Sequence, residues 1–252
     1  MSKLWPVKQF NERQLEALRP SPKIWKAKDA CEKIAHDKTF HDISIPYKTK
    51  EYLDSLRDHR FLNELTLKVG ARVVLLYNLM PGLVNGSQGV VVGFQPVKPE
   101  TEKMDQNGDP NSFRNRCMKE YKDTNGEMRP LVRFTNGMTE VIPAIPSTSL
   151  RGGAKVQDQY VVCRTQIPLT LAWALSIHKS QGMTLEYVEV SSKDMFETGQ
   201  LYVALSRATH LDGLRLTGFE RRQIPTDKDV LDFYTNTKWE KLDGRGRRKK
   251  KQ

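Results

Sequence analysis

The chain lacks the glycine-rich loop with which many enzymes hold the phosphates of ATP. Its 252 residues contain no Gly-x-x-x-x-Gly-Lys-Ser/Thr run. In such a run the backbone amides cradle the phosphates, the lysine reaches the β- and γ-phosphates, and the hydroxyl binds Mg²⁺. We therefore do not expect this chain to hydrolyse ATP by itself.

Cysteines and long apolar runs are also scarce. The three cysteines, Cys31, Cys117 and Cys163, are far apart and form no Cys-x-x-Cys pair. This spacing supports neither a disulfide framework nor a zinc site. The chain opens with no signal peptide, and no apolar run approaches the ~18 residues of a membrane span. We expect a soluble protein of a reducing compartment, although a missing native N-terminus would hide any targeting segment.

Positive charge is abundant. Lys and Arg number 41 against 30 Asp and Glu, so the net charge is +11 and the isoelectric point is about 9.5. This balance favours an anionic partner such as nucleic acid. Six of the positive charges lie in one run at 245–251, which we interpret as part of a disordered basic tail spanning 236–252. Such a run can serve as a nuclear address or a phosphate-contacting arm, or it can be inert.

Short strands dominate the predicted structure up to residue 150. A helix is expected at 11–18, ended by Pro20 and Pro22, because proline lacks the amide donor. Residues 24–60 are charged and weakly periodic, and we interpret them as strand, loop and one helix. Strands are then predicted at 65–69, 72–77, 89–94, 131–134 and 139–142, with a long polar loop at 95–129. Short strands joined by tight turns such as Asn85-Gly86 are typical of a small barrel.

A different pattern begins near Tyr160. Residues 169–175 are apolar, 176–181 read as a short helix closed by Gly182, and strands at 187–190 and 214–219 flank a helix at 200–208. Alternating strands and helices indicate an α/β layer with a parallel sheet. The β module would then be inserted into, or lie beside, an α/β domain.

Arg207 is the first candidate site residue. It lies near the end of the helix at 200–208, outside the stripe formed by Leu201, Ala204, Leu205 and Ala208. A guanidinium held there could reach a transferring phosphate bound on a neighbouring domain and stabilise its transition state. The alternative is an ordinary surface arginine, which helical position alone favours.

The turn before Gly182 is the second candidate. It places several donors between an apolar segment and the glycine: His178, Lys179, Ser180 and Gln181. Ligands of α/β sheets gather at such strand-to-helix ends, and a phosphate backbone would suit these donors. An ordinary polar turn with a C-capping glycine is the competing interpretation. A metal role for His178 is disfavoured, because no second ligand lies at a suitable spacing.

The amino-acid sequences of both segments resemble motifs of a known protein family. Residues 169–185, Leu-Thr-Leu-Ala-Trp-Ala-Leu-Ser-Ile-His-Lys-Ser-Gln-Gly-Met-Thr-Leu, resemble motif V of Pif-family DNA helicases, the RecD-like branch of superfamily one. Residues 196–208, Phe-Glu-Thr-Gly-Gln-Leu-Tyr-Val-Ala-Leu-Ser-Arg-Ala, resemble their motif VI. Residues 65–76 and 83–92 look like the Src-homology-like small barrel inserted in the second motor domain of that family.

The resemblance implies a role for each motif residue. Arg207 matches the motif VI arginine that reaches the γ-phosphate across the interdomain cleft, and Gln200 and Tyr202 match the neighbours that support this cofactor site. The motif V turn, which links single-stranded DNA contact to the nucleotide cleft, is matched by His178, Lys179, Ser180 and Gln181.

The implied activity is ATP-driven 5′ to 3′ translocation on single-stranded DNA and unwinding of duplex junctions, in DNA repair, recombination and telomere maintenance. ATP and Mg²⁺ would be held mainly by a first motor domain that this chain lacks. The implied fold class is α/β, a second RecA-like motor domain carrying the small β-barrel. Its parts would be residues 1–64, the barrel at 65–150, the remainder at 151–235 and the tail at 236–252. The family implies action in the nucleus, the mitochondrion or both.

The chain also departs from the family pattern. The Asp-Glu pair that holds magnesium has no counterpart, residues 4–15 look like a shortened motif IV, and the insert at 95–129 lies outside the common pattern. We therefore expect the C-terminal portion of a longer helicase, inactive alone. Two alternatives stay open: a stand-alone nucleic-acid-binding module, and a non-functional relic of a helicase gene.

Overall fold

The structure is a computed structural model, and it describes residues 4–33, 56, 59–97, 112–152, 159–192, 199–219 and 227–237. The fold is mixed α/β and divides into two compact units, Met1–Ser176 and Ile177–Gln252. The expected four-part domain division stays a prediction. The basic run at 245–251 lies outside the described residues, as do much of 24–60 and the first part of 95–129.

The first unit is built on an antiparallel sheet of five strands in the order β10-β4-β5-β6-β7. A two-stranded antiparallel pair, β1 and β3, lies in the same unit. The bounds are β1 Lys23–Lys26, β3 Glu64–Leu67, β4 Arg72–Leu75, β5 Gln88–Pro96, β6 Met128–Phe134, β7 Thr139–Val141 and β10 Leu169–Leu171. The strands predicted at 65–69, 72–77, 89–94, 131–134 and 139–142 are thereby confirmed as β3 to β7.

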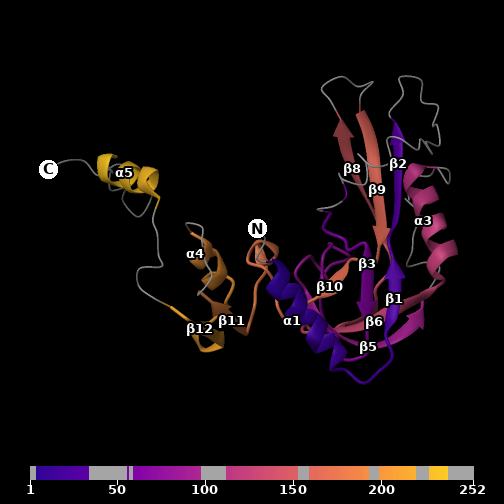
Figure 1. Cartoon of the computed structure of the whole chain (residues 1–252), viewed down its shortest axis with the longest axis horizontal. Helices are drawn as coiled ribbons and strands as arrows, with labels where there is room; N and C mark the ends of the chain where they lie inside the picture. Colours follow the sequence, from indigo (N-terminus) through magenta and orange to yellow (C-terminus); the bar gives the residue numbers. More distant parts are fainter. Residues whose placement is uncertain are drawn as a thin grey trace. The chain divides into compact units, whose positions relative to one another are not determined.

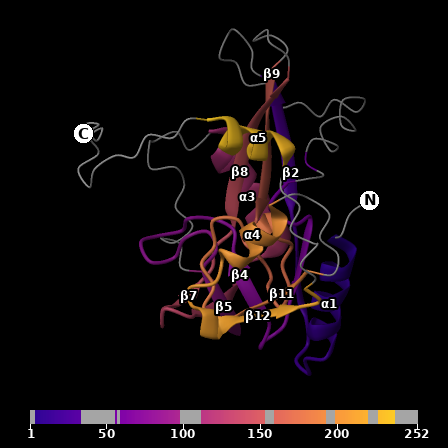
Figure 2. The ribbon, with the colours of Figure 1, turned by 90° about the vertical axis from the view of Figure 1, so that its left-hand side faces the viewer.

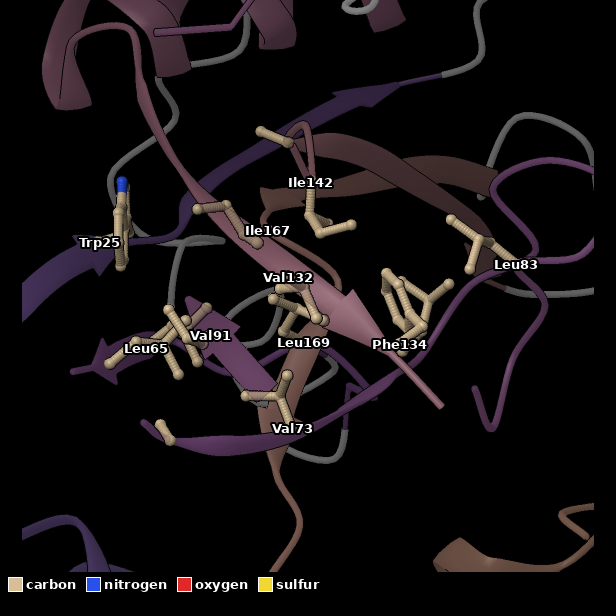
Figure 3. Close-up of a cluster of buried hydrophobic side chains, with 14 of the residues drawn as sticks. Trp25, Leu65, Val73, Leu83, Val91, Val132, Phe134, Ile142, Ile167 and Leu169 are labelled. Carbon is tan, nitrogen blue, oxygen red and sulfur yellow. The ribbon is translucent and has the colours of Figure 1, made fainter. Parts of the chain in front are cut away.

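Apolar side chains from these strands meet in one core. Trp25, Leu65, Val73, Val132 and Leu169 are all at most 3% exposed, and Figure 3 shows them converging from different strands. β-branched and leucine residues fill this space because they pack well on a pleated surface. Burial of these side chains supplies the main stabilisation of the unit.

Gly89 permits β5 and β6 to approach closely. A Cβ at this position would lie 2.6 Å from Val132 Cγ1 and 2.8 Å from the carbonyl oxygen of Arg133. Real Cβ atoms do not come so close to backbone, so only glycine fits between the strands at this point.

A second sheet of three antiparallel strands, in the order β2-β9-β8, extends beyond the first sheet in Figures 1 and 2. These strands are β2 Lys28–Lys33, β8 Ile145–Gly152 and β9 Gln159–Gln166. Helix α3, Phe113–Asn125, lies against all three strands. Inside the sheet, Arg164 pairs with Asp29 through two hydrogen bonds of 2.7 and 2.6 Å.

Two predictions for this region are wrong. The stretch at 95–129, expected to be a loop, contains helix α3, because its polar sequence also carries Cys117, Met118 and Tyr121 at helical spacing and all three are buried. The stretch from Tyr160 to residue 175, expected to start a parallel α/β layer, instead supplies the antiparallel strands β9 and β10. Pairing with distant strands decided the second case, as in the pair Leu169 and Leu75.

The first helix also differs from the prediction. Helix α1 spans Leu4–Glu16, whereas the sequence predicts 11–18. Asn11 therefore lies within the helix instead of at its start. Leu15 joins the core, and the Lys68 ammonium donates to the carbonyl of Leu18 at 2.8 Å, which holds the chain just beyond the helix end.

The second unit contains the parallel pairing that the sequence predicts. Strand β11, Val188–Ser191, runs parallel to β12, Leu214–Thr217, and helix α4, Gln200–Leu205, packs on them. The unit also has two 3₁₀ turns, η2 His178–Ser180 and η3 Leu211–Gly213, and a helix α5, Lys228–Asn236. Its core is small: Val190, Leu201 and Ala204 are buried, with Ile177 and Leu214 among the side chains packed against them.

Candidate functional site

The turn before Gly182 is one 3₁₀ turn followed by a reversal of the chain. Gln181 N–H donates to the carbonyl of His178 at 3.3 Å, and Gly182 adopts a φ of +77°, which favours glycine. The predicted short helix closed by glycine is thereby confirmed, although the 3₁₀ segment is limited to His178–Ser180.

The four polar residues of this turn divide into two kinds. Ser180 is only 7% exposed, and its hydroxyl donates to the carbonyl of Ile177 at 2.8 Å. His178, Lys179 and Gln181 are exposed. The serine thus shapes the turn from inside, while the other three side chains lie at the surface, where a ligand can meet them.

Arg207 follows helix α4, and its side chain is half-buried against backbone carbonyls. Nε donates to the carbonyl of Val203 at 3.0 Å, one terminal nitrogen to Ser206 Oγ at 3.0 Å, and the other to the carbonyl of Met183 at 3.4 Å. The last of these distances is at the long end for a hydrogen bond. The guanidinium is therefore turned onto the segment that leaves the polar turn.

Backbone pairing brings the two predicted segments together. Leu185 N–H donates to the carbonyl of Arg207 at 2.8 Å, and Thr209 N–H donates to the carbonyl of Leu185 at 3.0 Å. Ile177, at the start of the turn, packs on the core that Leu201 and Ala204 of α4 form. Backbone hydrogen bonds and apolar packing thus join the segment that follows the His178–Ser180 turn to the end of α4 in the second unit.

The two supporting residues of α4 lie differently. Gln200 begins the helix and is half-buried, whereas Tyr202 points into solvent with 76% of its side chain exposed. Such exposure is unusual for a tyrosine that has only a packing role. All seven predicted site residues belong to the second unit: His178, Lys179, Ser180, Gln181, Gln200, Tyr202 and Arg207.

Three groups that hold the site were not found from the sequence. These are the Ser206 hydroxyl and the carbonyls of Met183 and Val203, which position the Arg207 guanidinium. Every residue has a backbone carbonyl, so the sequence carries no signal for the roles of the Met183 and Val203 carbonyls. Ser206 could have been found, since it directly precedes the arginine.

Metal ligands and membrane spans were also sought in the described part of the chain. There, no group of three or more His, Cys, Asp or Glu side chains could hold a metal ion. In the same residues no helix combines the length and apolar character needed to cross a membrane.

Comparisons with known proteins match this chain over stretches of different length. A family model described as DNA helicase Pif1, 2B domain, matches residues 51–94. The ATP-dependent DNA helicase PIF1 of Danio rerio is 42% identical over 180 residues, which are 71% of this chain and 23% of that protein. The crystal structure of Pif1 helicase from Candida albicans matches with a TM-score of 0.65 and 31% identity, covering 94% of this chain and 48% of the other. Pif1 helicase from Bacteroides in complex with ADP-AlF3 and ssDNA matches with a TM-score of 0.50 and 25% identity, covering 93% and 43%.

These likenesses relate the chain to the ATP-dependent DNA helicases. Each of these matches is to a Pif1 helicase, as the resemblance of the chain's motifs predicts. The chain spans less than a quarter of the length of the Danio rerio and human relatives that it matches.

Proposed function

We propose that this chain is the second-motor-domain portion of a Pif1-type DNA helicase, with an inserted small β-barrel in its first unit. In this proposal the second unit carries the RecA-like elements that face the nucleotide and the DNA. ATP-driven 5′ to 3′ translocation and unwinding, in DNA repair, recombination and telomere maintenance, are proposed for the complete motor. The expected compartment is the nucleus, the mitochondrion or both.

The observation that carries the proposal is the placement of Arg207. Its guanidinium is positioned by the Val203 carbonyl and Ser206 Oγ, and held more loosely by the Met183 carbonyl at 3.4 Å. Since guanidinium binds phosphate oxygens through two parallel hydrogen bonds, a γ-phosphate can replace the weak carbonyl contact. The arginine would then stabilise charge that develops on the transferring phosphoryl group.

Gln200 and Tyr202 are assigned to the same nucleotide site. Both lie on α4, at its first and third positions, and Arg207 follows one residue after the C-cap of the helix. The half-buried amide of Gln200 can bind a phosphate or a water, and the exposed Tyr202 ring offers a face and a hydroxyl. The phosphate loop and the Mg²⁺ ligands would come from a first motor domain, because this sequence has no such loop.

Single-stranded DNA is the proposed partner of the polar turn. His178, Lys179 and Gln181 offer exposed donors that suit phosphate oxygens. Ser180 contributes by holding the turn through its bond to the Ile177 carbonyl. Leu185 N–H donates a hydrogen bond to the backbone carbonyl of Arg207. A movement of the turn when it binds DNA would therefore also move Arg207, the residue assigned to the nucleotide.

The test is reconstitution of the motor. The chain replaces the matched 23% of the ATP-dependent DNA helicase PIF1 of Danio rerio in a fusion protein, and DNA-stimulated ATP hydrolysis is measured. We expect Arg207→Ala to lower kcat at least a hundredfold with little change in thermal stability, since an arginine in this role contributes about 10³–10⁵ in kcat. Arg215→Ala is the matched control, because Arg215 lies exposed in the same unit and pairs only loosely with Glu189 at 3.7 Å.

Normal ATP turnover by the Arg207→Ala fusion would show that Arg207 does not have the proposed catalytic role.

A stand-alone nucleic-acid-binding module is the second candidate function. The net charge of +11 and the lack of a phosphate loop favour it. It is supported if the fusion hydrolyses no ATP while the chain alone binds DNA. A folded fusion without either activity would support the relic.

A further inference from the structure

Helix α3 and strand β9 each bring a buried cysteine to the place where they meet. Cys117 of α3 and Cys163 of β9 are at most 2% exposed. Their thiols form a hydrogen bond with each other, and neither belongs to a disulfide. Helix α3 lies against β9 in the first unit (Figure 1). The fold thus joins two sulfurs that are far apart in the sequence.

The two sulfurs are held by different elements. Cys163 is paired with Ala30 of β2 on one side and with Thr148 of β8 on the other, so it lies in the middle strand of the sheet. Cys117 belongs to the helix that lies on this sheet and moves with it. A covalent bond between the two sulfurs would therefore fix α3 to the centre of the sheet.

The surroundings of the two thiols differ. Cys163 Sγ lies 3.8 Å from the hydroxyl of Thr165. The hydrogen bond with Cys117, together with Thr165 and the positive charge of Arg114, lowers the pKa of Cys163 against the effect of burial. The same hydrogen bond and burial raise the pKa of Cys117. Because the thiolate is the reactive form of cysteine, Cys163 is the sulfur that reacts first.

We propose that Cys117 and Cys163 are a redox-sensitive pair, which hydrogen peroxide converts into a disulfide that ties α3 to β9. The Cys163 sulfur attacks one peroxide oxygen, the O–O bond breaks, and a sulfenic acid and one water result. The Cys117 sulfur then attacks the sulfenic sulfur and displaces its hydroxyl, which leaves as a second water with the Cys117 proton. Two electrons pass from the sulfurs to the peroxide, and an added thiol reverses the reaction by exchange.

The burial of both thiols sets how this reaction begins. Peroxide reaches Cys163 when α3 opens locally from the sheet, and the sulfenic acid meets Cys117 when the helix returns. A pair that only fills space in the core would oxidise no faster than the chain unfolds. The site lies in the first unit, and its chemistry needs neither nucleotide nor DNA.

The first test maps the bond in the full chain. The native chain is treated with hydrogen peroxide at pH 7.5, the remaining thiols are blocked, and an unreduced tryptic digest is analysed by mass spectrometry. We expect one linked pair of peptides, containing Cys117 and Cys163, which dithiothreitol separates. Cys31→Ser is the matched control and should keep this link, because Cys31 faces Val162 in the sheet and not Cys163. Cys117→Ala should lose it.

The second test measures what the bond does. Amide hydrogen exchange is compared before and after peroxide treatment, within each variant. In Cys31→Ser we expect the α3 amides from Cys117 to Tyr121 to exchange at least tenfold more slowly after oxidation, because the bond blocks the opening of the helix. In Cys117→Ala the same treatment should leave their exchange unchanged.

Three outcomes would overturn the proposal. One is a link between Cys117 and Cys163 that forms only in 6 M guanidinium chloride, since the native contact would then have no part in it. Another is oxidation of Cys163 to a sulfinic or sulfonic acid without a link. The third is a linked chain in which the α3 amides exchange as fast as in the reduced chain.

Discussion

At the scale of single residues, His59 is the clearest case in which burial changes chemistry. Burial and the nearby positive charge of Arg164 lower the pKa of His59 from its ordinary value of 6.5. Nδ1 of His59 accepts a hydrogen bond from Phe61 N–H at 3.0 Å, which requires that nitrogen to be unprotonated. The folded chain therefore prefers the neutral ring.

This preference predicts a loss of stability on acidification. Because the folded-state pKa lies below 6.5, the unfolded chain takes up a proton first, and the free energy of unfolding falls as the pH drops through 6.5 towards the folded-state pKa. Above pH 7 both states are neutral and the contribution is complete. Urea unfolding at pH 7.5, 6.5 and 5.5 measures the change.

His59→Asn isolates the effect, since the asparagine oxygen can accept from Phe61 N–H and does not titrate. We expect the variant to lose less stability than the wild type between pH 7.5 and 5.5. The other four histidines are present in both proteins, so parallel curves would mean that His59 is not the group responsible.

At the scale of elements, the side chain of Gln166 links helix α3 to other parts of the fold through four hydrogen bonds. Gln166 Oε1 accepts from the hydroxyl of Tyr121 at 2.9 Å and from Ile167 N–H at 2.9 Å. Its Nε2 donates to the carbonyls of Trp25 at 3.1 Å and Leu62 at 3.3 Å. Gln166 thus ties α3 to β1 and to the chain before β3.

Tyr121→Phe removes only one of these bonds. The ring stays in place beneath the Arg129 guanidinium, which lies 5.3 Å from its centre, while the buried Gln166 oxygen loses a donor. We expect the free energy of unfolding to fall by about 1 kcal/mol in urea titrations. Tyr187→Phe is the control and should change it little, because Tyr187 is 83% exposed. An equal, negligible effect of both replacements would show that this bond does not hold α3.

Local pattern explains which elements could be predicted. Strands β3 to β7 follow from β-branched runs and from turns such as Asn85-Gly86, whose signals lie within a few residues. The three-stranded sheet was missed because β2 pairs with β9, for example Lys28 with Thr165, and no local signal encodes so distant a partner. Helix α3 was missed because its polar surface hides three buried residues.

The candidate site shows the same limit. Position and spacing alone favoured an ordinary surface arginine at 207 and an ordinary polar turn at 178–181. Only the resemblance to family motifs made these residues candidates for a functional site. The buried Asn11 side chain shows this limit as well, since the sequence carries no signal for its contact with the backbone of Ala174 across the fold. Contacts to backbone are invisible in sequence, because the partner's residue type plays no part in them.

At the scale of the whole molecule, the net charge of +11 is the property most relevant to DNA. Phosphate contacts release counterions, so binding to single-stranded DNA weakens with salt, with a log–log slope of about 0.7 per contact. The charge does not tell where contacts form, since six positive side chains lie at 245–251, outside the described residues. Individual contributions must therefore be measured.

Lys179→Ala provides that measurement for the polar turn. We expect the salt slope of oligo-dT binding to fall by about 0.7 between 50 and 200 mM salt, because one phosphate contact is lost. Lys228→Ala removes the same charge from an exposed position of α5 and should leave the slope unchanged. Equal reductions by both variants would mean that net charge, not the turn, governs binding. A wild-type slope near zero would argue against phosphate contacts altogether.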